Sequence, residues 1–366
     1  MAKSGMKKKL ERIFDGSKEA DVILIANTSS KDPNFSYITG IVGGLFEGNI
    51  LLLKRDSAKL ITNQLEYELA ASQKPADLEL INASDAKQIK GILVRELRGK
   101  RVGVNQNAIT LDLYDKLKSE YRPKEILRSY SAFSDSRSIK DDEEISKIRK
   151  AAEITKKAME LIKKEFKVGV TEREIAQKFD YTCRNLGSES PSFDTIVAFG
   201  KNAAMPHHAP TDDKLRYGDI IKIDAGSKFG NYCSDITRTV IFGDDKGRIK
   251  DYSKKLEIIE IVKSAQKAAI KAIKPGMKGK DIHKIANDYI NNAVGGIYKG
   301  TFIHGLGHSL GLEVHDSSKP RLSPLSDDIL KPNMVVTVEP GIYISGFGGA
   351  RIEDDILITK DGAEIL

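Results

Sequence analysis

The run Ile220-Ile-Lys-Ile-Asp-Ala-Gly226 is followed, after a turn-forming segment, by Cys233-Ser-Asp-Ile-Thr-Arg-Thr-Val-Ile241, and these two runs are the most informative part of the sequence. Both runs are rich in isoleucine, valine and threonine, so each predicts a β-strand, and the glycines between them predict a turn. Neighbouring strands can hold Asp224 and Asp235 a few ångströms apart when both side chains point to the same face. The stretch therefore predicts a hairpin that presents two carboxylates.

The end of the chain contains a second hairpin of this kind. Glu339 lies in Val335-Val-Thr-Val-Glu-Pro-Gly-Ile-Tyr343, and Glu353 follows a glycine-rich loop in Arg351-Ile-Glu-Asp-Asp-Ile-Leu-Ile358. Two helical segments are expected before each hairpin, and in the first copy the second helix opens with the capping-box pattern Thr171-x-x-Glu174. We interpret the second part of the chain as a duplicated unit, with chance similarity between two helix–strand units as the alternative. Four identities recur at an offset of 107 residues: Ile154/Ile261, Ala158/Ala265, Gly169/Gly276 and Ile175/Ile282.

Four carboxylates inside Ile- and Val-rich strands are costly to ionise, because burial and mutual repulsion both oppose their charge. Two divalent cations would balance the four negative charges. His308 lies between the two hairpins in the sequence and offers a nitrogen ligand for the same ions. The alternative is that the acids are solvent-facing strand residues, but their repeated arrangement favours a metal site.

All six histidines lie after residue 200, so we expect any chemistry of metal binding or proton transfer in the second part. His304 and His308 have the spacing of a zinc-peptidase helix, but Gly305 stands where the glutamate is needed, and the surrounding glycines oppose a helix. Cys183 and Cys233 are fifty positions apart and indicate neither a disulfide framework nor a zinc knuckle.

The first ~130 residues alternate short apolar runs with helical segments, which is typical of an α/β domain. We expect strands at 22–26, 50–53, 59–62 and 101–104, and helices at 64–72, 86–97 and 111–119. A serine-rich segment without periodicity, 128–138, follows them. We therefore place a domain boundary there and expect two domains, 1–135 and 136–366.

Composition excludes several classes of protein. The 366 residues are 30% charged and 40% hydrophobic, and the net charge of +7 indicates a lysine-rich surface. No basic run with interleaved aromatics supports nucleic-acid binding. Apolar runs are only strand-sized, far short of the ~20 residues of a membrane helix, and the basic N-terminus does not lead into an apolar leader. We expect a cytoplasmic protein with no membrane or nucleic-acid partner.

These motifs resemble the metallopeptidase family that contains Xaa-Pro dipeptidase (prolidase), aminopeptidase P and methionine aminopeptidase, the pita-bread fold. The resemblance covers essentially the whole chain, because Asn34-Phe-Ser-Tyr-Ile-Thr-Gly40 is similar to a motif of the N-terminal domain of prolidases and aminopeptidases P. It implies a creatinase/prolidase-like mixed α/β domain at 1–135 and, at 136–366, a pita-bread (creatinase/aminopeptidase) domain with a pseudo-two-fold repeat. The five metal ligands of the family match Asp224, Asp235, His308, Glu339 and Glu353.

The resemblance also implies roles for other residues. Glu339 would act as the general base on a water that two ions bridge, and His207 and His315 would face the substrate. His304 matches a further active-site histidine, and Tyr343 and Arg351 are similar to groups that orient the ligating glutamates. The ligand set favours Mn²⁺ or Co²⁺ and leaves Zn²⁺ or Fe²⁺ open. A homodimer is expected on the same ground.

Substrate length stays open at this point. Many prolidases of the archaeal type have a Trp-Pro-Arg stretch whose arginine helps to hold the free carboxylate of the substrate, whereas this chain has Asp316-Ser-Ser-Lys-Pro-Arg321. Arg321, or Lys319, is the substitute that we expect. The activity implied is hydrolysis of Xaa-Pro dipeptides, with an aminopeptidase P acting on longer Xaa-Pro peptides as the alternative. A metal-free binding module of the same fold is the alternative from another class, and the retained ligands argue against it.

Overall fold

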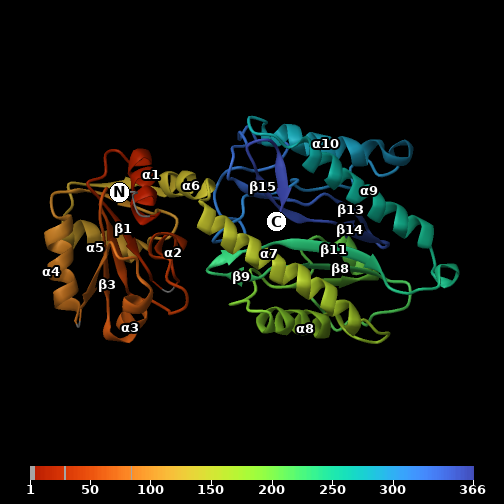
Figure 1. Cartoon of the computed structure of the whole chain (residues 1–366), viewed down its shortest axis with the longest axis horizontal. Coiled ribbons are helices and arrows are strands. Elements are labelled where there is room, and N and C mark those ends of the chain that lie inside the picture. Colours follow the sequence, from red (N-terminus) through yellow and green to blue (C-terminus); the bar gives the residue numbers. More distant parts are fainter. Residues whose placement is uncertain (1–4, 29, 84) are drawn as a thin grey trace. The chain divides into compact units, whose positions relative to one another are not determined.

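The computed structural model describes residues 5–28, 30–83 and 85–366 (Figure 1). Two compact units divide the chain between Arg137 and Ser138, and each is described by itself below. We call them unit 1 and unit 2. The first residues of the basic N-terminal segment, 1–4, lie outside the described residues.

Unit 1 contains a mixed six-stranded sheet in the order β4-β3-β2-β1-β5-β6. Pairing is antiparallel between β1 and β2 and between β2 and β3, and it is parallel elsewhere in the sheet. The predicted α/β character of this part is confirmed. Its strands are β1 (Val22–Ala26), β2 (Ile50–Leu53), β3 (Ala58–Thr62), β4 (Leu78–Asn82), β5 (Arg101–Val104) and β6 (Glu125–Arg128), and its helices are α1 (Gly5–Gly16), α2 (Pro33–Thr39), α3 (Gln64–Gln73), α4 (Ala86–Leu97) and α5 (Leu111–Lys116).

The serine-rich segment at the division between the units is helical. It forms α6 (Tyr130–Ser138), whose residues Ser134 and Ser136 are buried. The hydroxyl of Tyr37 donates to the carbonyl oxygen of Ser136 at 3.0 Å. Because much of the buried face of α6 is polar, it leaves no apolar periodicity, so a sequence pattern cannot reveal this helix.

Unit 2 contains two copies of one helix pair. α7 (Asp142–Ile162) and α9 (Tyr252–Ala272) each have 21 residues, and α8 (Glu172–Asn185) and α10 (Gly279–Asn292) each have 14. Between the helices of each pair lies a glycine with a left-handed backbone, Gly169 in one copy and Gly276 in the other, at φ values of 91° and 89°. α7 and α8 lie on one side of the strands of the unit, and α9 and α10 lie on the other (Figure 1).

The strands of unit 2 are broken at three of the four hairpin acids. Asp224 lies inside β8, but Asp235 precedes β11, Glu339 follows β12, and Glu353 precedes β15. The two main sheets have the orders β11-β8-β7 and β12-β15-β16. Their members and the remaining strands are β7 (Ile196–Phe199), β8 (Ile220–Ala225), β9 (Lys228–Phe229), β10 (Tyr232–Cys233), β11 (Ile236–Ile241), β12 (Val335–Val338), β13 (Gly341–Ile344), β14 (Gly348–Arg351), β15 (Asp354–Ile358) and β16 (Ala363–Ile365).

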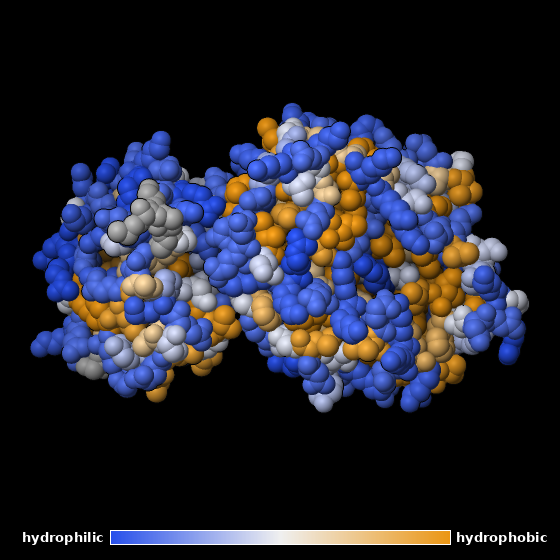
Figure 2. All heavy atoms as spheres, viewed as in Figure 1, coloured by the Kyte–Doolittle hydropathy of each residue, from blue (hydrophilic) through white to orange (hydrophobic). Residues whose placement is uncertain are grey.

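Each helix pair packs on its own hydrophobic cluster. Ile154, Phe179 and Ile223 belong to the cluster of the first copy, and Val262, Ile282 and Val336 belong to that of the second. Polar and charged side chains cover much of the face seen in Figure 2, with apolar residues exposed between them. Among the helices of the described residues, none has the length and apolar character that a membrane span requires.

Candidate metal centre

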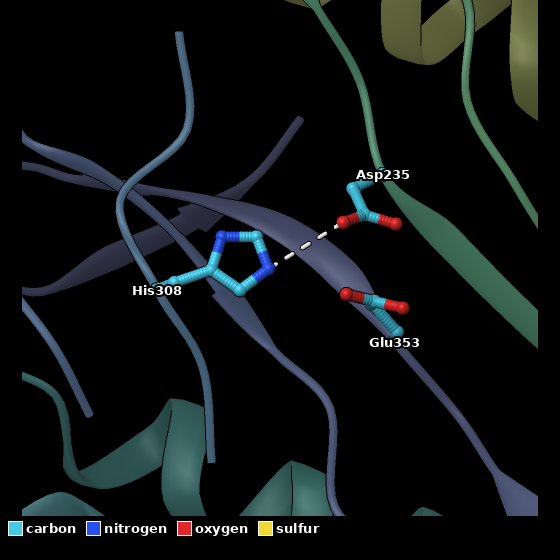
Figure 3. Close-up of side chains that lie close together, drawn as sticks. All are labelled: Asp235, His308 and Glu353. Atoms are coloured by element: carbon cyan, nitrogen blue, oxygen red, sulfur yellow. Dashed lines mark ion pairs between the residues drawn. The ribbon is translucent and has the colours of Figure 1, made fainter. Parts of the chain in front are cut away.

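Three side chains from separate segments of unit 2 converge at the junction of the two copies (Figure 3). Asp235 immediately precedes β11, Glu353 immediately precedes β15, and His308 comes from the irregular segment between α10 and β12. One ligand atom of each lies within 4.8 Å of the other two. His308 Nε2 lies 3.5 Å from Asp235 Oδ2. Because the two acids belong to different copies, both copies contribute to this cluster.

The other two predicted ligands lie beside the cluster. Glu339 Oε1 is 3.5 Å from Nε2 of His308. Asp224 pairs with the guanidinium group of Arg351 through its Oδ2 atom. All five predicted ligands line one pocket of about 760 Å³.

The electrostatics of these acids fit the binding of cations. Burial, followed by repulsion from Glu353 and Asp224, raises the pKa of Asp235 well above its usual range. Burial also raises the pKa of Glu339 to about 8, against the opposing effect of Arg351. Asp224 Oδ1 and Glu353 Oε1 are buried and have no hydrogen-bond partner among the described residues. Divalent cations would neutralise the acids and occupy these oxygens, and carboxylates with an imidazole are a suitable donor set.

His308 is suited to bind a metal because its ring is neutral. Burial, together with the neighbouring His315, lowers its pKa to about 4. The segment around it is held against β12, where Thr337 N–H donates to the His308 carbonyl at 2.9 Å. Gly307 permits this close approach, since a Cβ atom there would lie 1.9 Å from the carbonyl oxygen of Thr337.

Arg351 connects several members of the site. Its Nε donates to Thr237 Oγ1 at 3.0 Å, and its Nη1 donates to Tyr343 Oη at 2.8 Å. Thr237 Oγ1 in turn donates to Glu353 Oε2 at 2.6 Å. Arg351 Nε also lies 4.0 Å from carboxylate oxygens of Glu339 and Glu353. The buried guanidinium therefore fixes an aspartate directly and reaches Glu353 through a hydroxyl group.

Both ring nitrogens of His304 have partners inside the protein. Burial lowers its pKa to about 4, so the ring is neutral and has one N–H. Nδ1 donates to the Gly305 carbonyl at 2.7 Å, because a carbonyl can only accept. Nε2 then accepts from Tyr343 Oη at 2.9 Å. This places His304 in the pocket wall as an anchored group.

His207 and His315 are exposed and line the pocket with the acids. The ring of His315 lies 4.1 Å from that of His308, measured between centroids. Phe193 and Ile196 add an apolar part to the same wall. The pocket thus combines acids that could hold metal ions, exposed imidazoles and apolar surface, which are the parts expected of a small-substrate site.

The predicted substrate-carboxylate residue, Arg321, also lines the pocket and is largely exposed. Its Nε lies 3.6 Å from Asp328, which partly balances its charge. Lys319 is not among the residues that line the pocket. Lys228 of β9, which sequence reasoning missed, lines it as well. No sequence signal marks Lys228, because it lies in the turn-forming segment of the first hairpin.

Two further buried residues near His207 were also missed. Glu172 lies 2.7 Å from Nε2 of His208, and Lys222 Nζ donates to the Met205 carbonyl at 2.6 Å. Burial lowers the pKa of Lys222 to about 7. Glu172 stands inside the capping-box motif, where an acid is expected at the helix start for other reasons, so the sequence does not distinguish its role.

Comparisons with known proteins agree with this geometry. Residues 146–360 match the model of metallopeptidase family M24, and residues 8–139 match the creatinase/prolidase N-terminal domain. An Xaa-Pro dipeptidase of Pyrococcus horikoshii is 38% identical over 365 residues, which cover 99% of this chain and 97% of that protein.

Solved structures show the same similarity. An Xaa-Pro dipeptidase from Bacillus anthracis has a TM-score of 0.87 and 34% identity, covering 99% of this chain and 97% of that one. An X-Pro aminopeptidase from Thermotoga maritima has a TM-score of 0.86 and 32% identity, covering 96% of this chain and 97% of that one. The predicted family and fold are confirmed, and the chain belongs to metallopeptidase family M24, whose enzymes act with divalent metal ions.

Proposed function

We propose that the protein is a peptidase that hydrolyses the Xaa-Pro bond of proline dipeptides. The observation that carries this proposal is the cluster of Asp235, His308 and Glu353, flanked by Asp224 and Glu339 in one pocket. Full-length relatives described as Xaa-Pro dipeptidases support the choice of substrate.

The three residues of this cluster, together with Asp224 and Glu339, would hold two divalent ions, with Mn²⁺ or Co²⁺ favoured over Zn²⁺ or Fe²⁺. Bound ions supply Lewis acidity toward the scissile carbonyl and make a water molecule nucleophilic near neutral pH. Glu339 then takes a proton from the attacking water and passes it to the proline nitrogen that leaves. His207 and His315 donate hydrogen bonds to the oxyanion that develops on the carbonyl.

The remaining side chains orient these groups. Arg351 holds Asp224 and, through Thr237, Glu353, so the acids keep their positions while charge changes at the reacting atoms. Tyr343 links Arg351 to His304. With both of its nitrogens engaged, His304 shapes the wall and leaves hydrogen bonding to the substrate to the exposed histidines.

The choice between dipeptides and longer peptides depends on the free carboxylate of the substrate. A dipeptide places this carboxylate beside the leaving proline, where a cation in the pocket wall can bind it. Arg321 and Lys228 are both in that wall. An aminopeptidase that accepts longer peptides is the second candidate, because the fold is almost equally similar to an X-Pro aminopeptidase.

The test compares hydrolysis of Leu-Pro and Leu-Pro-Gly by chelator-treated protein to which Mn²⁺ or Co²⁺ is returned. We expect strong preference for the dipeptide, whereas equal or faster cleavage of the tripeptide would establish the aminopeptidase. Protein that contains no metal after purification and gains no activity from added ions would instead support a binding module. A homodimer and a cytoplasmic location stay predictions from the sequence.

A further inference from the structure

The segment 199–211 of unit 2 carries His207 into the pocket, and one buried carboxylate holds it at both ends. Glu172, the first residue of α8, is fully buried. Its Oε1 accepts from Phe199 N–H at 2.8 Å and from Asn202 Nδ2 at 2.9 Å. These two bonds fasten the start of the segment to α8.

The second oxygen of Glu172 fastens the end of the segment. Oε2 accepts from the backbone N–H of Thr211 at 2.9 Å and from its Oγ1 at 2.7 Å. The same oxygen also pairs with Nε2 of His208 at 2.7 Å, and His208 is the residue that follows His207 in the sequence. Burial acts to raise the pKa of Glu172, but the hydrogen bonds from His208, Asn202, Phe199 and Thr211 together outweigh it and lower the pKa. An ionised carboxylate that accepts all these bonds is the form that the surroundings favour.

We infer that Glu172 is a positioning residue for His207, acting by holding segment 199–211 without contacting the substrate. His207 lines the pocket and Glu172 does not. The bond to His208 fixes the adjacent residue, so loss of the carboxylate displaces the His207 ring directly. This inference rests on the proposed function, in which His207 stabilises the reacting carbonyl.

Glu172→Gln tests it with little change in volume. The amide nitrogen of glutamine can only donate hydrogen bonds. Wherever it takes the place of a carboxylate oxygen, it therefore meets at least two of the groups that now donate to Glu172, and those hydrogen bonds are lost. We expect kcat for Leu-Pro to fall about tenfold to a hundredfold, with KM little changed, because a misplaced group costs most in the transition state. Glu174→Gln is the matched control, since Glu174 caps the same helix through Thr171 and is exposed. It should leave both constants unchanged.

A double-mutant cycle separates positioning from general damage. In a His207→Ala background, Glu172→Gln should cause no further loss of kcat, because the group that it positions is gone. An equal fold-loss in both backgrounds, or no loss in the single variant, would overturn the inference. If Glu172→Gln does not fold, Thr211→Val removes one of the five bonds and undergoes the same cycle.

A spectroscopic readout keeps this inference distinct from the proposed function. If the unmodified protein does not hydrolyse Leu-Pro, the proposed function fails, but the position of His207 can still be measured. With ¹³C-labelled histidine, the ring signal assigned to His207 should shift in Glu172→Gln and stay in place in Glu174→Gln. An unmoved His207 signal in Glu172→Gln would contradict the positioning role.

Discussion

Replacing Arg351 by methionine removes a buried cation from a group of acids. The change breaks the pair with Asp224 and the hydrogen bonds to Thr237 and Tyr343, and it leaves these partners buried. Removing one partner of a buried ion pair costs about 3–5 kcal/mol. Unit 2 spans the 229 residues Ser138–Leu366, and for this size each kcal/mol corresponds to about 2–4 °C. We therefore expect the metal-free variant to melt about 6–20 °C below the unmodified protein.

Calorimetry at pH 7.5, with chelator and with excess Mn²⁺, measures this difference. Divalent ions replace the lost charge but not the hydrogen bonds, so the deficit should shrink to about 1–3 kcal/mol when metal is present. Arg149→Met is the matched control, because Arg149 forms an exposed pair with Glu364 that is worth about 1 kcal/mol or less. A deficit that is small, or one that metal does not reduce, would refute the assignment of Arg351 as an internal counter-ion of the site.

Four other substitutions test separate parts of the site. Glu339→Gln should abolish turnover of Leu-Pro while circular dichroism shows intact folding, and appreciable remaining activity would mean that the general base lies elsewhere. Arg321→Met and Lys228→Met should each raise KM for Leu-Pro about tenfold while leaving KM for Leu-Pro-amide unchanged, corresponding to about 1.4 kcal/mol for a lost carboxylate contact. Gly307→Ala would place a Cβ atom 1.9 Å from a backbone carbonyl, so thermal melting should show a loss of about 3 kcal/mol or more. Gly305→Ala is the milder control at 3.3 Å, and equal stability of the two variants would contradict the tight approach at Gly307.

Sequence patterns predicted the strands and helices in which buried apolar residues form continuous runs or recur at regular spacing. The strands expected at 22–26, 50–53 and 101–104 have those bounds, because their apolar runs fill the sheet of unit 1. In unit 2 the recurrence of Gly169 and Gly276 indicated the duplicated helix pairs, since each glycine adopts a left-handed backbone at the same point.

Patterns could not predict the contacts made by isolated polar side chains. Glu172 looks like an ordinary acid at a helix start, and its burial depends on a segment 27–39 residues further along the chain. Lys222 looks like a polar strand residue, but it is fully buried. Arg351 was expected to orient the ligating glutamates, and its Nε lies 4.0 Å from carboxylate oxygens of both, but its pairing with Asp224 was not foreseen. Such pairings arise from packing between segments that are far apart in the sequence. The periodic pattern of apolar residues within one segment therefore cannot predict them.

The sharing of the cluster between the two copies has a mechanical consequence. Asp235 and Glu353 are separated by 118 positions in the sequence but contribute to one group of ligand atoms. A metal ion that binds both would act as a removable cross-link, closing a long loop in the way that a disulfide does. Withdrawal of the ion would then weaken the docking of one copy on the other more than it weakens either copy. In the metal-free protein, unfolding would therefore begin with separation of the two copies at the pocket.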